Sequence, residues 1–184
     1  MRSFRAGLLL SGLAVAAYSA TTASLQNSTE LSSLRRTNSL VLGPSVERLV
    51  VFLGSSACRA STRDSLRDDL RILGGMLHEQ DSVMSVRTFM IGVSTDYDVV
   101  SGTEYLTALY PFDEITVGRG FLNVAVSHFL LGQAESALAI PQILVIDRQI
   151  HVDSIAISVG PSSLVRRVIG ADSIHAWVSR GAIR

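Results

Sequence analysis

The residue with the clearest chemistry in this sequence is its only cysteine, Cys58, which is followed three positions later by Ser61. A lone thiol cannot form a disulfide within the chain, and a serine cannot resolve a mixed disulfide. Cys58 stands where we expect a helix to begin, and Arg59 follows it. A helix N-terminus and a neighbouring positive charge both lower the pKa of a cysteine. The sequence therefore allows monothiol chemistry at Cys58 and excludes a dithiol cycle.

The other polar residues offer little further chemistry. The four histidines share no spacing typical of metal ligands, and without a cysteine pair the usual zinc sites are excluded. Helix capping or solvated turns explain the acid pairs Asp96 and Asp98, and Asp113 and Glu114, better than catalysis does. Basic and acidic residues number 16 each, with no run of like charge. We therefore expect no metal, no cofactor and no nucleic-acid partner.

A predicted strand, helix and second strand surround Cys58. The apolar run at 48–53 (RLVVFL) is typical of a buried strand, and so is the run at 86–93 (VRTFMIGV). Between them, Ser61 is the expected N-cap of a helix, with Asp64 at the capping-box spacing and leucines recurring on one face. This order predicts two parallel strands joined by a crossover helix.

The rest of the chain predicts further helices and strands. They are, in order, a helix ending at Leu109, a largely buried helix at 121–131, strands at 143–146 and 151–159, and a helix at 162–169. The first of these helices has Asp96 or Ser94 as its expected N-cap. The two strands are close enough to form an antiparallel hairpin. Trp177 is expected to pack in the core. The whole pattern predicts an α/β domain.

This element order, with the run IPQILVID at 140–147, resembles the thioredoxin superfamily and most closely the membrane-anchored, TlpA-like thioredoxins of bacteria. The resemblance covers roughly residues 46–170. It implies a thioredoxin-like mixed sheet flanked by helices. It also implies that Pro141 is a cis-proline that opens a core strand and faces the active-site cysteine, Cys58. The usual glycine turn after this strand is missing from 148–150.

The same resemblance implies Cys-x-x-Cys chemistry, from which this chain departs. Ser61 replaces the second cysteine, and Ala57 stands in the usual tryptophan position. A domain that no longer catalyses is therefore one reading, and a monothiol that holds partner thiols is another. A peroxidase similar to the peroxiredoxins is a third. Ser55 fits that family's pattern, but Val51 stands where its proline should be.

The N-terminus has the layout of an export signal. Arg2 and Arg5 precede an uncharged apolar stretch at 6–25. Its length matches the roughly 20 residues that a helix needs to cross the hydrocarbon core of a bilayer. Cleavage among the small residues at 17–23 is one alternative. Retention of 1–25 as a signal-anchor is the other, and we favour it. The basic end would then stay in the cytoplasm and send the rest outward.

Within the apolar stretch, Gly12, Ala16 and Ala20 recur at a spacing of four. Such a stripe lets another transmembrane helix approach closely, although small residues are also common in signal segments. Residues 26–46 are polar and rich in serine, threonine and asparagine, which predicts a linker, and 47–184 would form the domain. We expect a single-pass protein of the inner membrane with a periplasmic domain.

Two classes of function follow from these expectations. The first is a non-catalytic, membrane-anchored subunit that binds or stabilises a larger membrane protein complex through its helix and its outward domain. An electron-transport complex is one such assembly. The second is an anchored monothiol thiol–disulfide oxidoreductase or peroxidase that acts through Cys58 in the periplasm. The replacement of the second cysteine by Ser61 favours the first class.

Overall fold

A computed structural model describes residues 43–84, 86–131 and 138–182 of the chain. The expected membrane helix, with its stripe of Gly12, Ala16 and Ala20, lies outside these residues, and so does most of the expected linker. No helix in the described part of the chain combines the length and the apolar character needed to cross a bilayer.

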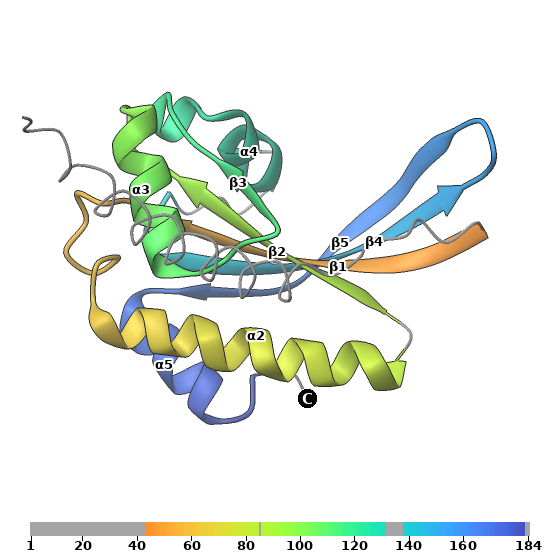
Figure 1. The fold of residues 1–184 in the computed structure, drawn as a ribbon, viewed down its shortest axis with the longest axis horizontal. Helices are drawn as coiled ribbons and strands as arrows, with labels where there is room; N and C mark the ends of the chain where they lie inside the picture. The colour runs from red at the N-terminus through yellow and green to blue at the C-terminus, as the bar shows by residue number, and fades with distance from the viewer. Residues whose placement is uncertain (1–42, 85, 132–137, 183–184) are drawn as a thin grey trace, which may run out of the picture. The chain divides into compact units, whose positions relative to one another are not determined.

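The described residues form a mixed five-stranded sheet flanked by helices, which confirms the predicted α/β class (Figure 1). The strands are β1 (Gly43–Gly54), β2 (Arg87–Ser94), β3 (Glu114–Thr116), β4 (Gln142–Val152) and β5 (Ile157–Ile169). Their order across the sheet is β3-β2-β1-β4-β5. β1, β2 and β3 run parallel, β4 runs antiparallel to β1, and β5 runs antiparallel to β4. The predicted strand–helix–strand unit is thus confirmed, and β1 begins earlier than the run at 48–53.

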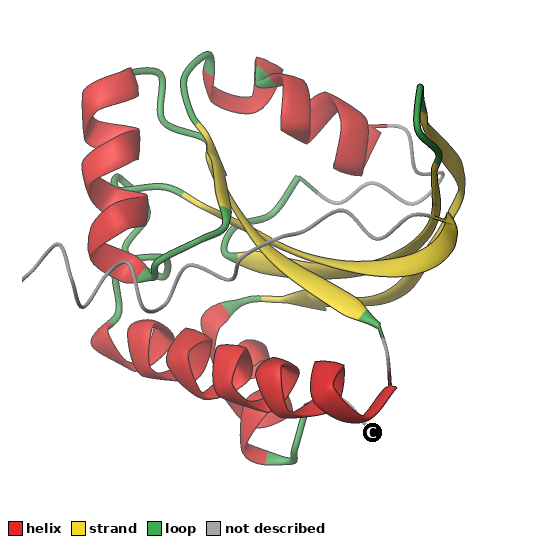
Figure 2. Ribbon diagram, turned by 45° about the vertical axis from the view of Figure 1, so that its right-hand side comes forward, coloured by secondary structure: helices red, strands yellow, loops and turns green. Residues whose placement is uncertain are grey.

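Helices cover both faces of this sheet. They are α2 (Asp64–Met84), α3 (Val99–Leu109), α4 (Val124–Val126) and α5 (Ala171–Ser179), with a 3₁₀ turn η1 (Gly120–Leu122) and a π turn η2 (Ser127–Leu131). Figures 1 and 2 place α2 and α5 on one face and the segment from η1 to η2 on the other. α3 packs beside β2.

Alternation along the central strand β1 divides the core into two layers. Val50 and Phe52 face the layer under α2, α3 and α5, while Leu49, Val51 and Leu53 face the layer under α4 and η2. Trp177 on α5 is 6% exposed and belongs to the first layer, which confirms its expected packing role.

The predicted helix at 121–131 is wrong in two respects. The structure breaks it into η1, α4 and η2, because the Asn123 side chain accepts a hydrogen bond from the backbone of Ala125 and starts a new turn. The segment is also less buried than expected, since the side chains of Leu122 and Val124 are 63% and 70% exposed. Ala125, Val126 and Leu130 are its buried residues in the core, and Phe129 packs against them partly buried.

The predicted helix at 162–169 is also wrong, because these residues belong to β5. They pair with β4 from Ser162 opposite Arg148 to Ile169 opposite Gln142. Their apolar positions fit a helix as well as a strand, so the pairing with β4 decides the outcome. The β-branched residues Val165, Val168 and Ile169 suit the extended conformation.

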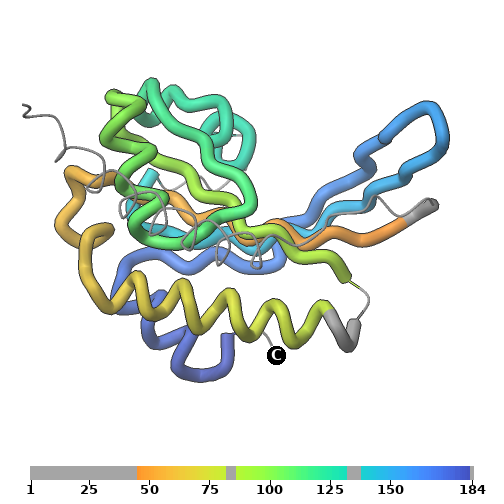
Figure 3. Tube along the Cα trace, viewed as in Figure 1, coloured from red at the N-terminus to blue at the C-terminus, as the bar shows by residue number. Residues whose placement is uncertain are grey.

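The hairpin between β4 and β5 is antiparallel as expected, but its turn lies later in the chain. β4 continues to Val152, and the reversal occurs at 153–156, where the Asp153 carboxylate accepts hydrogen bonds from two backbone amides (Figure 3). Residues 148–150, which lack a glycine, stay in the strand. Two ion pairs join this part of β4 to β1: Arg48 with Asp147, and Arg148 with Glu47.

The position of Gly92 on β2 has no room for a side chain, because an aromatic ring packs against it. A Cβ at Gly92 would lie 2.7 Å from the ring of Phe112, which stacks on the buried Phe52 with 6.0 Å between the centroids. Gly92→Ala should therefore lower the free energy of unfolding by about 2 kcal/mol through overpacking. Urea denaturation measures the change. Gly75→Ala on α2, where a Cβ meets nothing within 4 Å, should instead stabilise by about 0.5–1 kcal/mol. A neutral Gly92→Ala would contradict the packing argument.

Candidate functional site

Cys58 lies in a tight turn between β1 and α2. The amides of Ser61 and Thr62 both donate to the Cys58 carbonyl, at 2.9 and 3.2 Å. α2 begins only at Asp64, so Cys58 precedes the helix instead of occupying its first turn. The expected N-cap at Ser61 is wrong, because its buried hydroxyl makes no hydrogen bond to another described oxygen or nitrogen.

The turn brings Cys58 next to the start of β4. The peptide bond between Ile140 and Pro141 is cis, and the Cys58 thiol donates to the Ile140 carbonyl with 3.7 Å between sulfur and oxygen. Pro141 is buried, and its carbonyl accepts a hydrogen bond from Gly170 at 2.8 Å. The sequence-derived site residues Cys58, Ser61 and Pro141 thus gather at one edge of the sheet, although 82 positions separate Cys58 from Ile140.

The surroundings of Cys58 favour the thiolate. Burial raises the pKa of Cys58, but hydrogen bonds from the Ser61 hydroxyl and from the amides of Ser61 and Ala60 outweigh burial and lower it below its ordinary value. The buried Ser61 hydroxyl has no oxygen or nitrogen hydrogen-bond partner among the described residues and is therefore available to an ionised sulfur. The sequence predicted the same direction from a helix N-terminus and Arg59, whereas the structure assigns it to the turn and Ser61.

Beside this turn, Asp96 forms a buried carboxylate network at the carboxyl ends of β1 and β2. Asp96 is 8% exposed and accepts hydrogen bonds from the hydroxyls of Ser55 (2.6 Å) and Ser94 (2.7 Å). It also accepts from the amide (3.0 Å) and hydroxyl (3.1 Å) of Ser56. Burial raises the pKa of Asp96, but these hydrogen bonds lower it overall, so the carboxyl stays ionised.

Asp96 therefore has a different role from the one its sequence suggested. We expected Asp96 or Ser94 to cap the following helix, and this is wrong. The cap of α3 is Asp98, whose carboxylate accepts from the Ser101 amide at 2.7 Å. Asp96 instead ties the loop after β1 to the loop after β2, which fixes the start of the Cys58 turn.

Tyr105 on α3 anchors the Cys58 turn through a hydrogen bond. Its hydroxyl donates to the Ser61 carbonyl at 3.0 Å. Burial raises the pKa of Tyr105, so the hydroxyl keeps its proton and remains a donor. A Cβ at Gly54 would collide with this hydroxyl, so the end of β1 has room for glycine alone. Tyr105 and Asp96 thus position Ser61 after Cys58 and Ser55 before it.

An exposed apolar surface lies next to the Asp96 network, and we call it the apolar rim. It consists of large side chains from the start of α3 and from the η1–α4 segment: Tyr97, Val99, Val100, Phe121, Leu122 and Val124. The two parts meet where Gly120 donates to the Asp96 carbonyl at 3.3 Å and a Cβ at Gly120 would touch the Tyr97 ring. Exposed apolar side chains brought near one another in this way are a feature of surfaces that bind proteins, membranes or ligands.

The edge thus combines a cysteine whose pKa is lowered, a cis-proline and the apolar rim. In the part of the chain that the structure describes, no three histidine, cysteine, aspartate or glutamate side chains gather to hold a metal ion. The arrangement can ionise a thiol and offer backbone and apolar groups to a partner segment. Comparisons of the chain with protein families, with characterised proteins and with solved structures find no match.

Proposed function

We propose that this chain is a membrane-anchored, thioredoxin-like accessory subunit that holds a partner protein at the Cys58–Pro141 edge without catalytic turnover. The mixed sheet and the cis-proline beside the cysteine support the thioredoxin-like assignment. Anchoring by 1–25 and a periplasmic position rest on the sequence alone. The partner is an integral membrane complex that also contacts the anchor.

The observation that carries this proposal is the position of Cys58, whose sulfur lies 3.7 Å from the carbonyl of Ile140 at the cis Ile140–Pro141 peptide, with Ser61 where the resolving thiol would be. The Cys58 thiolate attacks one sulfur of a partner disulfide, forms a new S–S bond to it, and releases the other partner sulfur as a thiolate. The partner disulfide is the oxidant, so no other co-reactant is needed. Because Ser61 cannot attack the new bond, the adduct persists.

The apolar rim supports a protein as the partner. It borders the Asp96 network that leads into the Cys58 turn, so a segment held at Cys58 and Pro141 could continue over it. Aromatic and large aliphatic side chains are the usual anchors of protein interfaces. The peroxidase alternative is less well supported, because the Ser55 hydroxyl is already committed to Asp96.

The proposal is tested on the full-length chain in its native membranes. Free thiols are blocked, the membranes are extracted in mild detergent, and the proteins that co-purify with the chain are identified. We expect a stoichiometric complex in which Cys58 is disulfide-linked to a partner. Cys58→Ser should abolish the covalent adduct and keep the association, whereas Leu122→Asp on the apolar rim should weaken the association. Ser61→Cys should restore a resolving thiol, so the adduct should disappear.

The matched control is Val159→Asp, an exposed apolar position on the β4–β5 hairpin outside the apolar rim, which should leave the complex intact. A chain found alone and without an adduct in wild-type membranes would overturn the proposal. An adduct that is unaffected by Ser61→Cys would contradict the role of the turn.

A further inference from the structure

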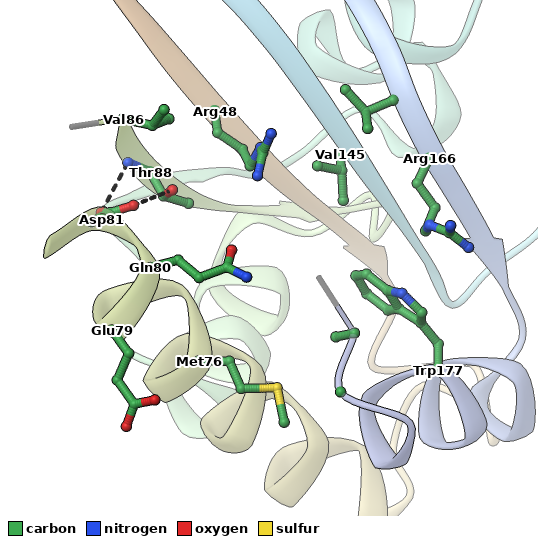
Figure 4. Close-up of a pocket in the computed structure, with 13 residues that line it drawn as sticks. Arg48, Met76, Glu79, Gln80, Asp81, Val86, Thr88, Val145, Arg166 and Trp177 are labelled. Atoms are coloured by element: carbon green, nitrogen blue, oxygen red, sulfur yellow. Dashed lines mark hydrogen bonds between the residues drawn. The ribbon is translucent and has the colours of Figure 1, made fainter. Parts of the chain in front are cut away.

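A pocket of about 830 Å³ lies on the face of the sheet that α2 and α5 cover (Figure 4). Its walls come from α2, α5 and four strands, and Cys58, Ser61 and Pro141 are not among the residues that line it. Its size falls within the range of small-molecule sites, roughly 300–1,000 Å³.

The inner wall of the pocket is apolar. Val145 on β4 and Trp177 on α5 are both nearly buried and still line it, and Met76 on α2 adds a thioether from the opposite wall. Figure 4 shows the Trp177 indole standing beside Val145 at the inner side of the cavity. Aromatic and aliphatic walls of this kind accept the apolar body of a ligand.

Most charges in the lining are already engaged. Arg48 donates to both Asp147 oxygens, at 2.7 and 2.8 Å. The Asp81 carboxylate accepts from the amide and hydroxyl of Thr88, at 3.1 and 2.6 Å. Glu79 points away from the cavity in Figure 4. The remaining cation is Arg166, which extends toward Trp177 and forms no ion pair with any described residue.

A β-bulge brings Val165 into the lining beside Arg166, which lies on this face because it pairs with Val145. Val145 pairs with Arg166 but Ile146 pairs with Leu164, so Val165 is an extra residue in β5. Neighbouring residues of a regular strand point to opposite faces, whereas Val165 and Arg166 both line the pocket. Bulges commonly redirect a side chain in this way next to functional sites.

We propose that this pocket binds a small molecule with an apolar body and one carboxylate. The apolar body packs against Val145, Trp177 and Met76, and the carboxylate pairs with Arg166. Arg166 is exposed and forms no ion pair with a described residue, so it is available to an anion, and a guanidinium matches the two oxygens of a carboxylate. The acidic side chain of Asp81 lies at the other end of the lining and disfavours a second negative charge there.

Tryptophan fluorescence tests this proposal directly, because Trp177 is the only tryptophan in the chain. The full-length chain in lipid nanodiscs is titrated with 4-phenylbutyrate, 4-phenylbutanol and 4-phenylbutylamine, which share a body and differ in the head group. We expect a saturable change with the carboxylate, and weaker binding of the alcohol and the amine. Arg166→Ala should raise the Kd for the carboxylate about tenfold, and Arg166→Lys should raise it less.

The matched control is Arg71→Ala, an exposed arginine on α2 outside the lining, which should leave the Kd unchanged. No saturable response would overturn the proposal, and so would equal binding of carboxylate and alcohol. Tighter binding of the amine would assign the specificity to the acidic end instead. A normal Kd in a well-folded Arg166→Ala protein would exclude the assigned cation.

Discussion

Replacing Asp96 by alanine is expected to lower the free energy of unfolding by about 3 kcal/mol, the largest loss we expect from a single polar side chain here. The substitution leaves the buried hydroxyls of Ser55 and Ser94 and the amide of Ser56 without their acceptor. Urea denaturation followed by circular dichroism measures the change. Asp98→Ala, which removes an exposed helix cap, should lower the free energy of unfolding much less and serves as control.

The same carboxylate should make stability depend on pH. The pKa of Asp96 is lowered in the folded state, so its contribution is complete above the value for an unfolded aspartate, about 3.9. That contribution is lost as the pH falls through the lower folded value. The difference in stability between wild type and Asp96→Asn should therefore be full at about pH 7 and smaller at about pH 3. An equal difference at both values would contradict an ionised Asp96.

Alkylation of Cys58 by iodoacetamide should show an inflection at a lower pH than that of a free thiol such as glutathione. The Ser61 hydroxyl and the amides of the turn favour the thiolate, which is the species that reacts. Ser61→Ala removes one of these donors, so it should move the inflection to higher pH and slow alkylation several-fold on the acid side. The rate constant is measured across the pH range on the folded protein.

Thr62→Ala is the control for this experiment. The Thr62 hydroxyl is one residue away but donates to the Arg59 carbonyl, so its loss should leave the inflection in place. An inflection at the free-thiol value in the wild-type protein would contradict a stabilised thiolate. An inflection unmoved by Ser61→Ala would assign the stabilisation to the backbone amides alone.

The sequence predicts the parallel core of this fold because its signals are local. The apolar run of β1 ends at a glycine, and the leucines of α2 recur with helical spacing, so each element can be recognised alone. β5 cannot be recognised this way. Leu164, Val165, Val168 and Ile169 also fit one face of a helix, and only pairing with β4 makes them a strand.

The residues that could react were predictable from the sequence, but the residues that hold them in place were less so. Cys58 and Ser61 can be picked out by their residue types. Pro141 can be picked out because the run at 140–147 resembles the thioredoxin strand that a cis-proline opens. The role of Asp96 depends on Ser55 and Ser56, some 40 positions away, which no local pattern connects to it. The available signal was that both segments follow parallel strands, whose carboxyl ends lie at one edge of the sheet.

The two ion pairs between β1 and β4 also discriminate between alignments of these strands. Glu47 lies opposite Arg148, and Arg48 lies opposite Asp147. A slip by one residue in one direction would put Glu47 opposite Asp147, and a slip in the other would put Arg48 opposite Arg148. Both errors oppose like charges, which destabilise a strand pair. Because each strand carries one acidic and one basic residue side by side, both alignments shifted by one residue are penalised. Such a shift would also turn the apolar side chains of one strand to the wrong face of the sheet.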